Sequence, residues 1–185
     1  MWCRAIGLLA CASLAHAHDG LHSSGGVGAA NAFVAKSQLA TLDGSRFVEL
    51  AKLGQPLLIN FWGVDCPPCI AELPALAEFA NQQPAWTVVL VSTDSAQTAR
   101  DFLRKRPLPE LPNLLLLKAS ANPRASMRAA GNGNGALPYT VATKRLLVSG
   151  VAGPKATADS ATTCFAQVGM LDAADFKAAL AACLP

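Results

Sequence analysis

The chain has 185 residues, of which 52% are hydrophobic and 15% are charged, and its formal net charge is +3. This length fits one domain with a sizeable core. The small net charge provides no basic patch of the kind that nucleic acids require, which excludes a nucleic-acid-binding function. After the N-terminal segment, no apolar stretch is long enough for a transmembrane helix.

The first residues have the pattern of a secretory signal peptide, predicted at residues 1–17. Arg4 supplies the positive charge, an apolar segment runs from Ala5 to Leu14, and Ala15-His16-Ala17 forms a small-x-small cleavage site. A buried N-terminal helix would leave this cleavage pattern unexplained. The alternative is lipoprotein processing, with Cys11 as a lipidated N-terminus. Either route exports the protein.

Residues 18–36 are predicted to form a flexible leader, because Gly, Ser and Ala dominate the mature start. His18 and His22 could bind a metal, but no third ligand lies nearby, and a solvated tail is the better interpretation. The predicted folded domain spans residues 37–185.

A hairpin opens the predicted domain. Two apolar segments, Gln38–Leu42 and Phe47–Leu50, are joined by Asp43-Gly44, a pair typical of tight hairpin turns. After a short connection, Leu57–Trp62 is a continuous apolar run, the pattern of a buried strand.

A C-x-x-C motif, Cys66-Pro67-Pro68-Cys69, follows this strand after a brief turn, and apolar residues then repeat at helical spacing. The motif therefore lies where a strand passes into a helix. Unpaired N–H groups and the helix dipole favour an anion at that point, which lowers the pKa of the Cys66 thiol and makes it the attacking sulfur. Cys69 is the expected resolving thiol. A purely structural cross-link is the weaker alternative, because so short a loop restricts the unfolded chain little.

The rest of the chain alternates between predicted strands and helices. Pro74 lies inside the helix that follows the cysteines and is expected to kink it, because proline removes a backbone donor. The helix ends around Asn81 to Pro84. The later predicted elements are strands at Thr87–Val91 and Leu114–Leu117, helices at Ala96–Arg106 and Pro123–Ala130, a hairpin formed by Tyr139–Lys144 and Leu146–Val151, and a final helix at Leu171–Cys183.

The residues around the cysteines resemble the thioredoxin superfamily, and more closely its TlpA/ResA-like periplasmic branch. The match is Asn60-Phe61-Trp62 followed by C-x-x-C-x-x-E-x-P, in which Glu72 and Pro74 fill the last two positions. Cytosolic thioredoxins have Asp where this chain has Asn60. Asp65 departs from the family, which usually has Trp there.

This resemblance implies an α/β, thioredoxin-like fold, with a central mixed β-sheet flanked by helices and an N-terminal β-hairpin. It covers roughly Gln38–Val151 and the final helix. Nothing is carried over to Gly153–Met170, which is longer than the family usually has at this point. By the same resemblance, the location is periplasmic.

A proline before the strand at Tyr139 is the second feature shared with the family. By resemblance, the Leu137–Pro138 bond is cis and lies against the C-x-x-C, where the backbone of Leu137 pairs with a substrate chain. An ordinary trans proline at a strand start is the alternative. The candidate substrate-binding residues are Trp62, Pro67, Pro68, Leu137 and Pro138.

Four cysteines remain once the signal peptide is removed, and three pairings of them are possible. The C-x-x-C pair is assigned to redox chemistry, so Cys164 and Cys183 are predicted to form a structural disulfide that ties an irregular segment to the final helix. A zinc site is the alternative, but Cys164 and Cys183 lie far apart in the sequence. No metal and no cofactor is predicted.

The predicted direction of electron flow is reducing. Pro67 and Pro68 donate no backbone N–H, and the carboxylates of Asp65 and Glu72 place negative charge near the sulfurs. Relative to a strongly oxidising site, these features should raise the pKa of Cys66, and a less stabilised thiolate means a less stabilised reduced form and a more reducing couple. Cys66, Cys69 and Glu72 are the candidate catalytic residues of an exported thiol–disulfide reductase.

The resemblance also implies partners: a DsbD-like membrane electron donor, and protein clients such as the oxidised haem-binding cysteines of apocytochrome c or those of another assembly pathway. The alternatives are a disulfide oxidant or isomerase, and a redox-inert binding protein or chaperone with the same fold.

Overall fold

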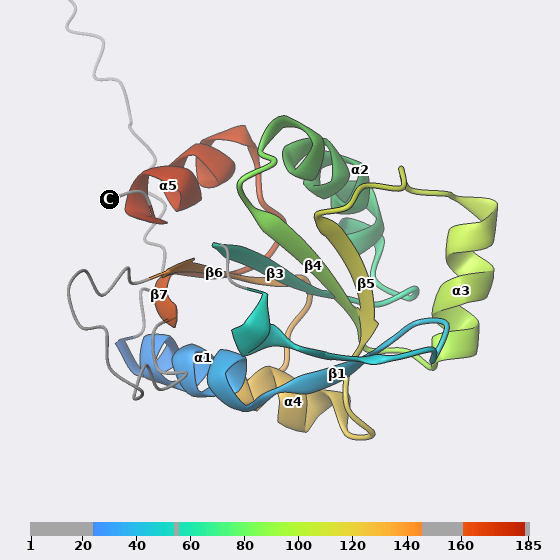
Figure 1. Ribbon diagram of the computed structural model, residues 1–185, viewed down its shortest axis with the longest axis horizontal. Helices are drawn as coiled ribbons and strands as arrows, with labels where there is room; N and C mark the ends of the chain where they lie inside the picture. Colours follow the sequence, from blue (N-terminus) through green and yellow to red (C-terminus); the bar gives the residue numbers. More distant parts are fainter. Residues whose placement is uncertain (1–23, 54–55, 146–160, 184–185) are drawn as a thin grey trace, which may run out of the picture.

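The computed structural model describes residues 24–53, 56–145 and 161–183 (Figure 1). Within these residues a seven-stranded sheet has the order β2-β1-β5-β4-β3-β6-β7. The strands are β1 (Gln38–Thr41), β2 (Phe47–Glu49), β3 (Leu57–Trp62), β4 (Thr87–Ser92), β5 (Leu114–Lys118), β6 (Tyr139–Arg145) and β7 (Ala161–Val168). The helices are α1 (Ser24–Lys36), the 3-10 helix η1 (Leu50–Lys52), α2 (Pro67–Gln82), α3 (Ala96–Lys105), α4 (Pro123–Ala129) and α5 (Ala173–Cys183).

The sheet is mixed. The three central strands β3, β4 and β5 run parallel to one another, whereas β6, β7, β1 and β2 pair antiparallel with their neighbours. All residues of β3 and β4 are buried, as expected for parallel strands covered on both faces. The predicted α/β fold, with a central mixed sheet, flanking helices and an N-terminal hairpin, is confirmed.

Helices α2 and α5 cover one face of the sheet and α1 and α4 the other, with α3 beside β5 (Figure 1). Successive side chains of β3 alternate between these faces. Leu57, Ile59 and Phe61 pack with α1 and α4, while Leu58 and Trp62 pack with α2. Asn60 lies on the α2 side, so a polar side chain faces the helix that carries the C-x-x-C.

The flexible leader is wrong for residues 24–36, which form α1. Gly and Ser are poor helix formers, so the composition alone argues against a helix. Ala30, Phe33 and Val34 nevertheless share one face and are at most 6% exposed. Phe33 packs on Phe61 with 5.7 Å between ring centroids, so tertiary burial outweighs the weak local propensity. Residues 1–23, with the predicted signal peptide, Cys11, His18 and His22, lie outside the described residues.

The prediction that Cys164 lies in an irregular segment is wrong, because it belongs to β7. Strand β7 pairs antiparallel with β6, from Tyr139 opposite Val168 to Arg145 opposite Ala161. The predicted partner of β6, Leu146–Val151, lies outside the described residues. Ala and Thr dominate β7, so it lacks the apolar run by which the other strands were recognised.

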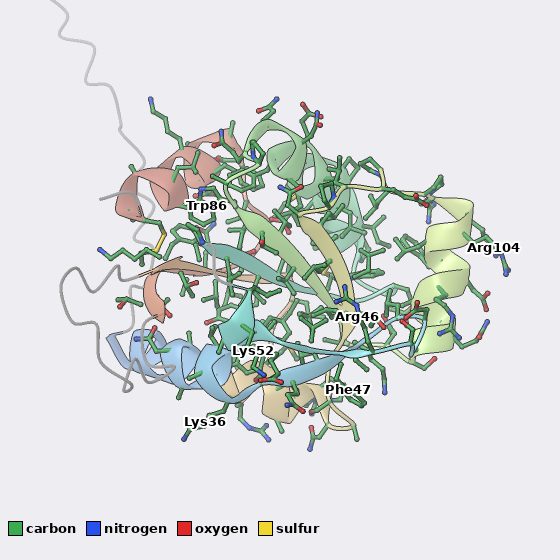
Figure 2. All side chains as sticks on the ribbon, viewed as in Figure 1. Lys36, Arg46, Phe47, Lys52, Trp86 and Arg104 are labelled. Carbon is green, nitrogen blue, oxygen red and sulfur yellow. A yellow bond between two sulfur atoms is a disulfide. The ribbon has the colours of Figure 1, made fainter. Side chains whose placement is uncertain are left out.

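The other predicted elements are confirmed to within a few residues, including the hairpin turn at Gly44, whose φ of 72° favours glycine. Phe47 on the edge strand β2 is 72% exposed, whereas Trp86 before β4 is 3% exposed (Figure 2). In the described part of the chain no helix is sufficiently long and apolar to cross a membrane.

Candidate active site

The C-x-x-C lies at the junction of β3 and α2. Cys66 is the N-cap of α2, and Pro67 and Pro68 fill the first helical positions, where the missing N–H groups would have no intrahelical partner in any case. The Cys69 N–H donates to Cys66 Sγ at 3.3 Å. The two cysteines form a disulfide with their Cα atoms 5.2 Å apart, so the structure is that of the oxidised protein.

The two sulfurs differ in access to solvent. Cys66 is half-buried and Pro67 and Pro68 are exposed, whereas Cys69 is fully buried among the residues of the core beneath α2. A partner sulfur can therefore approach Cys66 but not Cys69. This asymmetry is what an attacking and a resolving cysteine require, because the attacking thiol must be accessible.

The turn between β3 and Cys66 is fixed by two residues that the sequence did not single out. Asp94 Oδ2 accepts from the Val64 N–H at 2.8 Å, and the Thr93 hydroxyl donates to the Trp62 carbonyl at 3.1 Å. A Cβ atom on Gly63 would lie 3.0 Å from Thr93 Oγ1, so any larger residue here would push the Thr93 side chain outward by a few tenths of an ångström. Both holding residues follow β4, the parallel neighbour of β3, and this adjacency was their only sequence signal.

Glu72 is buried one helical turn after Cys69, on the same face of α2, and only 2% of it is exposed. Its Oε1 accepts from the Leu171 backbone N–H at 2.7 Å, and its Oε2 accepts from Asn60 Nδ2 at 3.2 Å. Burial raises the pKa of Glu72 above its usual 4.5, although these two hydrogen bonds act in the opposite direction. Asp175 on α5 raises it further by charge repulsion.

Asn60 links Glu72 to the neighbouring strand, because its Nδ2 also donates to Thr140 Oγ1 on β6 at 2.9 Å. Asn60 is fully buried, and its Oδ1 has no partner among the described residues. The resemblance singled out Asn60 only as a family marker. In the structure the Asn60 side chain lies between the Glu72 carboxylate on α2 and the Thr140 hydroxyl on β6 and donates to both.

Trp62 does not fit the role of a substrate-binding residue. It is fully buried, and its ring lies 5.8 Å from that of Phe102 on α3. A side chain in this position supports the site from below and has no surface to offer a client. The sequence could not show this, because an aromatic residue at the end of a strand can point to either face of the sheet.

The Leu137–Pro138 peptide bond is cis, as the resemblance implies. Leu137 lies beside the turn before Cys66, since its Cδ1 would be 3.6 Å from a Cβ on Gly63. Pro138 is buried, and its carbonyl accepts from the Gly169 N–H at 2.8 Å. The residues flanking Gly169, Val168 and Met170, are 48% and 50% exposed. An apolar surface therefore borders the proline on the β7 side.

A second disulfide joins Cys164 on β7 to Cys183, the last residue of α5. Cys183 is 3% exposed, and the bridge closes a loop across a sequence separation of 19. All four cysteines beyond Cys11 are thus paired. Within the described ranges, no three His, Cys, Asp or Glu side chains are grouped so that they could hold a metal ion.

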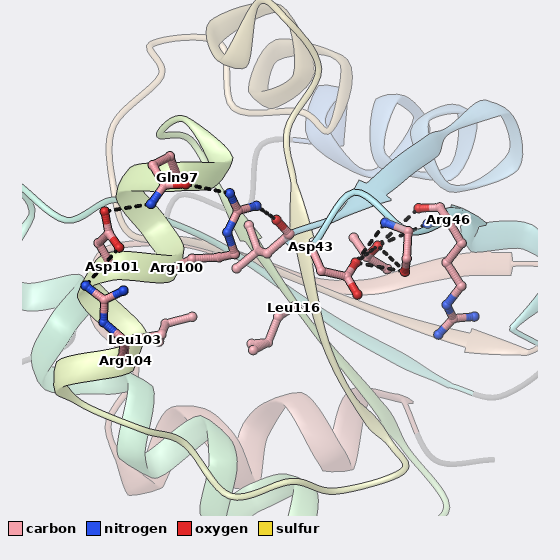
Figure 3. A pocket seen from close by; sticks show the side chains of 11 residues that line it. Asp43, Arg46, Gln97, Arg100, Asp101, Leu103, Arg104 and Leu116 are labelled. Atoms are coloured by element: carbon pink, nitrogen blue, oxygen red, sulfur yellow. Dashed lines mark hydrogen bonds and ion pairs between the residues drawn. The ribbon is translucent and has the colours of Figure 1, made fainter.

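A pocket of about 620 Å³ lies away from the cysteines, between the β1–β2 turn, β5 and α3 (Figure 3). Its polar rim is largely paired within itself: Arg100 donates to the Leu42 carbonyl and to Gln97, and Arg104 pairs with Asp101. Asp43 accepts from Thr41 and from Ser45, and these bonds hold its pKa at about 2. No residue of α2 lines this pocket.

Fold and site together define a thioredoxin-like α/β protein with a disulfide at the N-terminus of its central helix. Residues 29–139, more than half of the chain, match the AhpC/TSA family, and the chain belongs to this family.

Individual proteins show the same likeness. Over 76 residues, 38% of this chain, the sequence is 30% identical to sporulation thiol-disulfide oxidoreductase A of Bacillus subtilis, and the match spans 46% of that protein, about half its length. A secreted Mycobacterium tuberculosis disulfide oxidoreductase homologous to E. coli DsbE has a similar structure, with a TM-score of 0.55 and 23% identity over 80% of this chain and 97% of that one. StoA from Bacillus subtilis also has a TM-score of 0.55, with 18% identity over 78% of this chain and 95% of that one. At these identities the structural likeness shows the fold.

Proposed function

We propose that this protein is an exported thiol–disulfide oxidoreductase that reduces disulfides of client proteins. The observation that carries the proposal is the asymmetry of the C-x-x-C: Cys66 is accessible at a helix N-cap, and Cys69 is buried behind it. The similar proteins are named as thiol-disulfide or disulfide oxidoreductases, which supports the same reaction class.

In the proposed reaction, the Cys66 thiolate attacks one sulfur of a client disulfide. A mixed disulfide forms, and the client's other sulfur leaves as a thiolate that takes up a proton. Cys69 then loses its proton and attacks Cys66 Sγ. The second client sulfur leaves, so the client has gained two electrons and two protons, and the Cys66–Cys69 disulfide has formed. A membrane dithiol donor of the DsbD type then reverses these steps on the protein.

Glu72 is the proposed proton-exchanging group. It is the buried carboxylate one turn from Cys69, and burial raises its pKa, so its proton exchanges nearer to neutral pH than that of an ordinary glutamate. In its ionised form it opposes a thiolate on Cys69 by charge repulsion. Either form therefore influences the second step, in which Cys69 must become a thiolate.

The proposed client surface follows from the surroundings of Pro138. Neither the N–H nor the carbonyl of Leu137 has a backbone partner among the described residues, so an extended client segment can pair with them. Leu137 lies beside Gly63 in the turn before Cys66, and the exposed Val168 and Met170 flank Gly169, whose N–H donates to the Pro138 carbonyl. Such a surface suits an unfolded chain whose cysteine is flanked by apolar residues, as in an assembly pathway for cytochrome c or another exported protein.

The reducing direction rests on the stabilisation available to the Cys66 thiolate. With proline in the first two helical positions, the Cys69 N–H is the nearby backbone donor, and it lies 3.3 Å from the sulfur. Glu72 adds negative charge on the same helix when ionised. Compared with a strongly oxidising site, where more N–H groups face the sulfur, this helix N-terminus stabilises the thiolate less, which makes the couple more reducing.

Equilibration with glutathione buffers tests the direction. We expect a reduction potential nearer to that of thioredoxin, roughly −270 mV, than to that of DsbA, roughly −120 mV. A value near that of DsbA would reverse the assignment to an oxidant. Turnover of insulin disulfides with a thiol donor tests the reaction class itself, and no turnover by the reduced protein would leave the redox-inert binding role.

A further inference from the structure

We propose that the Cys164–Cys183 bridge positions the active-site carboxylate: by fastening α5 to β7, it holds the backbone N–H of Leu171 against Glu72 on the face of α2 that carries Cys69. The inference rests on the proposed function, in which Glu72 exchanges protons with the dithiol. It gives the second disulfide a part in the redox reaction beyond cross-linking the fold.

The contact at the centre of this inference joins two distant parts of the chain. The Leu171 N–H donates to Glu72 Oε1 at 2.7 Å, across a sequence separation of 99. Both residues are buried, Leu171 at 4% and Glu72 at 2% exposure. Among the described residues, Leu171 and Asn60 are the donors to this carboxylate. A buried carboxylate depends on such donors, because it has lost its hydration.

The segment that carries Leu171 is held at both of its ends. On the β7 side, the Gly169 N–H donates to the Pro138 carbonyl at 2.8 Å. On the other side, the Asp172 N–H donates to Asp175 Oδ2 at 2.9 Å in the first turn of α5, which fixes the start of that helix. The position of the Leu171 N–H therefore depends on where α5 lies.

Helix α5 has 11 residues, a length at which an isolated helix is marginal in water. Three contacts hold it against the rest of the fold. Phe176 stacks on Phe79 of α2 with 5.5 Å between the ring centroids, Ala179 is buried, and the disulfide fastens the last residue of the helix. The bridge joins the C-terminal end of α5 to β7. Its loss frees that end of the helix, and because α5 closely follows Leu171 in the chain, a change in the orientation of α5 moves Leu171 at its N-terminal end.

The groups around Glu72 determine the direction of the expected effect. From α5, Asp175 is the charged group that acts on it, whereas β3 and β6 contribute the neutral Asn60 and Thr140. On α2 itself Cys69 lies one turn before Glu72, and it does not titrate while it is part of a disulfide. The Leu171 hydrogen bond favours the ionised carboxylate, so its loss moves the Glu72 titration to higher pH.

The experiment follows the Glu72 carboxyl signal against pH by carbon NMR in the oxidised protein, with Glu72→Gln to assign the signal. The variants are Cys164→Ala/Cys183→Ala and the better-filled Cys164→Val/Cys183→Ala. In both we expect Glu72 to titrate at higher pH than in the wild type and the Leu171 amide to exchange faster with deuterium. Asp175→Asn, which keeps the bridge and removes the repelling charge, is expected to shift the titration the opposite way.

Met127→Ala is the matched control, because it creates a cavity on the other face of the sheet and does not touch this chain of contacts. A lowered melting temperature in the bridge variants with an unchanged Glu72 titration would assign the bridge a purely structural role. An equal shift in Met127→Ala would mean that any loosening of the fold moves Glu72, and would also overturn the inference. Because the oxidised protein is titrated without a client, a failure here is distinct from a failure of insulin turnover.

Discussion

Two disulfides in one chain have the same spacing of their Cα atoms, 5.2 Å, and very different surroundings. Cys66–Cys69 lies at a helix N-cap, with Cys66 half-buried and Cys69 fully buried. Cys164–Cys183 joins the end of one helix to the middle of a strand, and Cys183 is 3% exposed. The separation of the Cα atoms therefore says nothing about which bond takes part in exchange.

Access and local charge separate the two bonds instead. An attacking thiolate must reach a sulfur and must be stabilised once it has formed, and the N-terminus of α2 provides both conditions. The other bridge closes a longer loop, and such a bond stabilises mainly by restricting the unfolded chain. We therefore expect the Cys66–Cys69 bond to exchange with clients and the Cys164–Cys183 bond to persist.

The largest expected effect comes from single substitutions in the C-x-x-C. Cys66→Ser should reduce turnover of insulin disulfides to background, because the accessible nucleophile is gone. Cys69→Ser should also stop turnover but should accumulate mixed disulfides with clients, since Cys66 can still attack and nothing resolves the product. Non-reducing gels compare the two variants. Equal trapping by both would contradict the assigned roles and remove the contrast between the exposed and the buried sulfur.

The next largest effect concerns the stability that the second bridge provides. On the chain-entropy model, a loop of this length contributes about 3 kcal/mol. Cys164→Ala/Cys183→Ala should therefore lower the melting temperature by roughly 6–12 °C in a chain of this size. Thermal unfolding followed by circular dichroism measures the change, with the wild-type protein in the same oxidised state as reference.

Selective reduction sharpens the same contrast. Under a mild thiol donor, alkylation and peptide mapping should label Cys66 and Cys69 and leave Cys164 and Cys183 protected, because structural bridges have the lower potentials. If all four cysteines become labelled together, the two bonds do not differ in the way that their surroundings suggest.

The sequence predicted the local parts of this site well. The strand, turn and helix around Cys66 and Cys69 are contiguous in the chain, so apolar periodicity and motif spacing were sufficient. The contacts of Glu72 were not predictable, because its partner Leu171 is 99 residues away and takes part through its backbone, which has no residue-specific signal. The same applies to Asp94, which holds Val64 across 30 residues.

Two elements were missed for the opposite reason, because local composition pointed elsewhere. The first half of helix α1 is rich in Gly, and β7 has no continuous apolar run, so neither stands out from a loop. Both form because the folded chain buries them: α1 packs against β7, and the Asn31 side chain accepts from the Thr163 hydroxyl at 2.7 Å. Tertiary contacts of this kind override weak intrinsic propensity.

The smallest expected effect is the change in the pH dependence of stability in Glu72→Gln. The buried carboxyl of Glu72 has a pKa raised above 4.5, so the folded state favours the protonated form. The stability that comes from this preference is complete below about pH 4.5 and is lost as the pH rises through the raised pKa. A glutamine side chain does not titrate and has no such loss, so the variant should gain stability relative to the wild type across that window. Urea unfolding of both oxidised proteins at a series of pH values measures the difference.

In the reduced protein, the same substitution removes a negative charge near the thiols above the pKa of Glu72. The pKa of Cys66 should then fall. Its alkylation near neutral pH should become several-fold faster, because below the pKa each unit by which the pKa falls raises the thiolate fraction tenfold. Glu78→Gln, on the exposed side of the same helix, is the matched control and should change neither profile. If Glu72→Gln and Glu78→Gln give the same stability profile and the same alkylation rate, the carboxylate of Glu72 has only a packing role. Its charge then does not distinguish the Cys66–Cys69 bond from the other bridge.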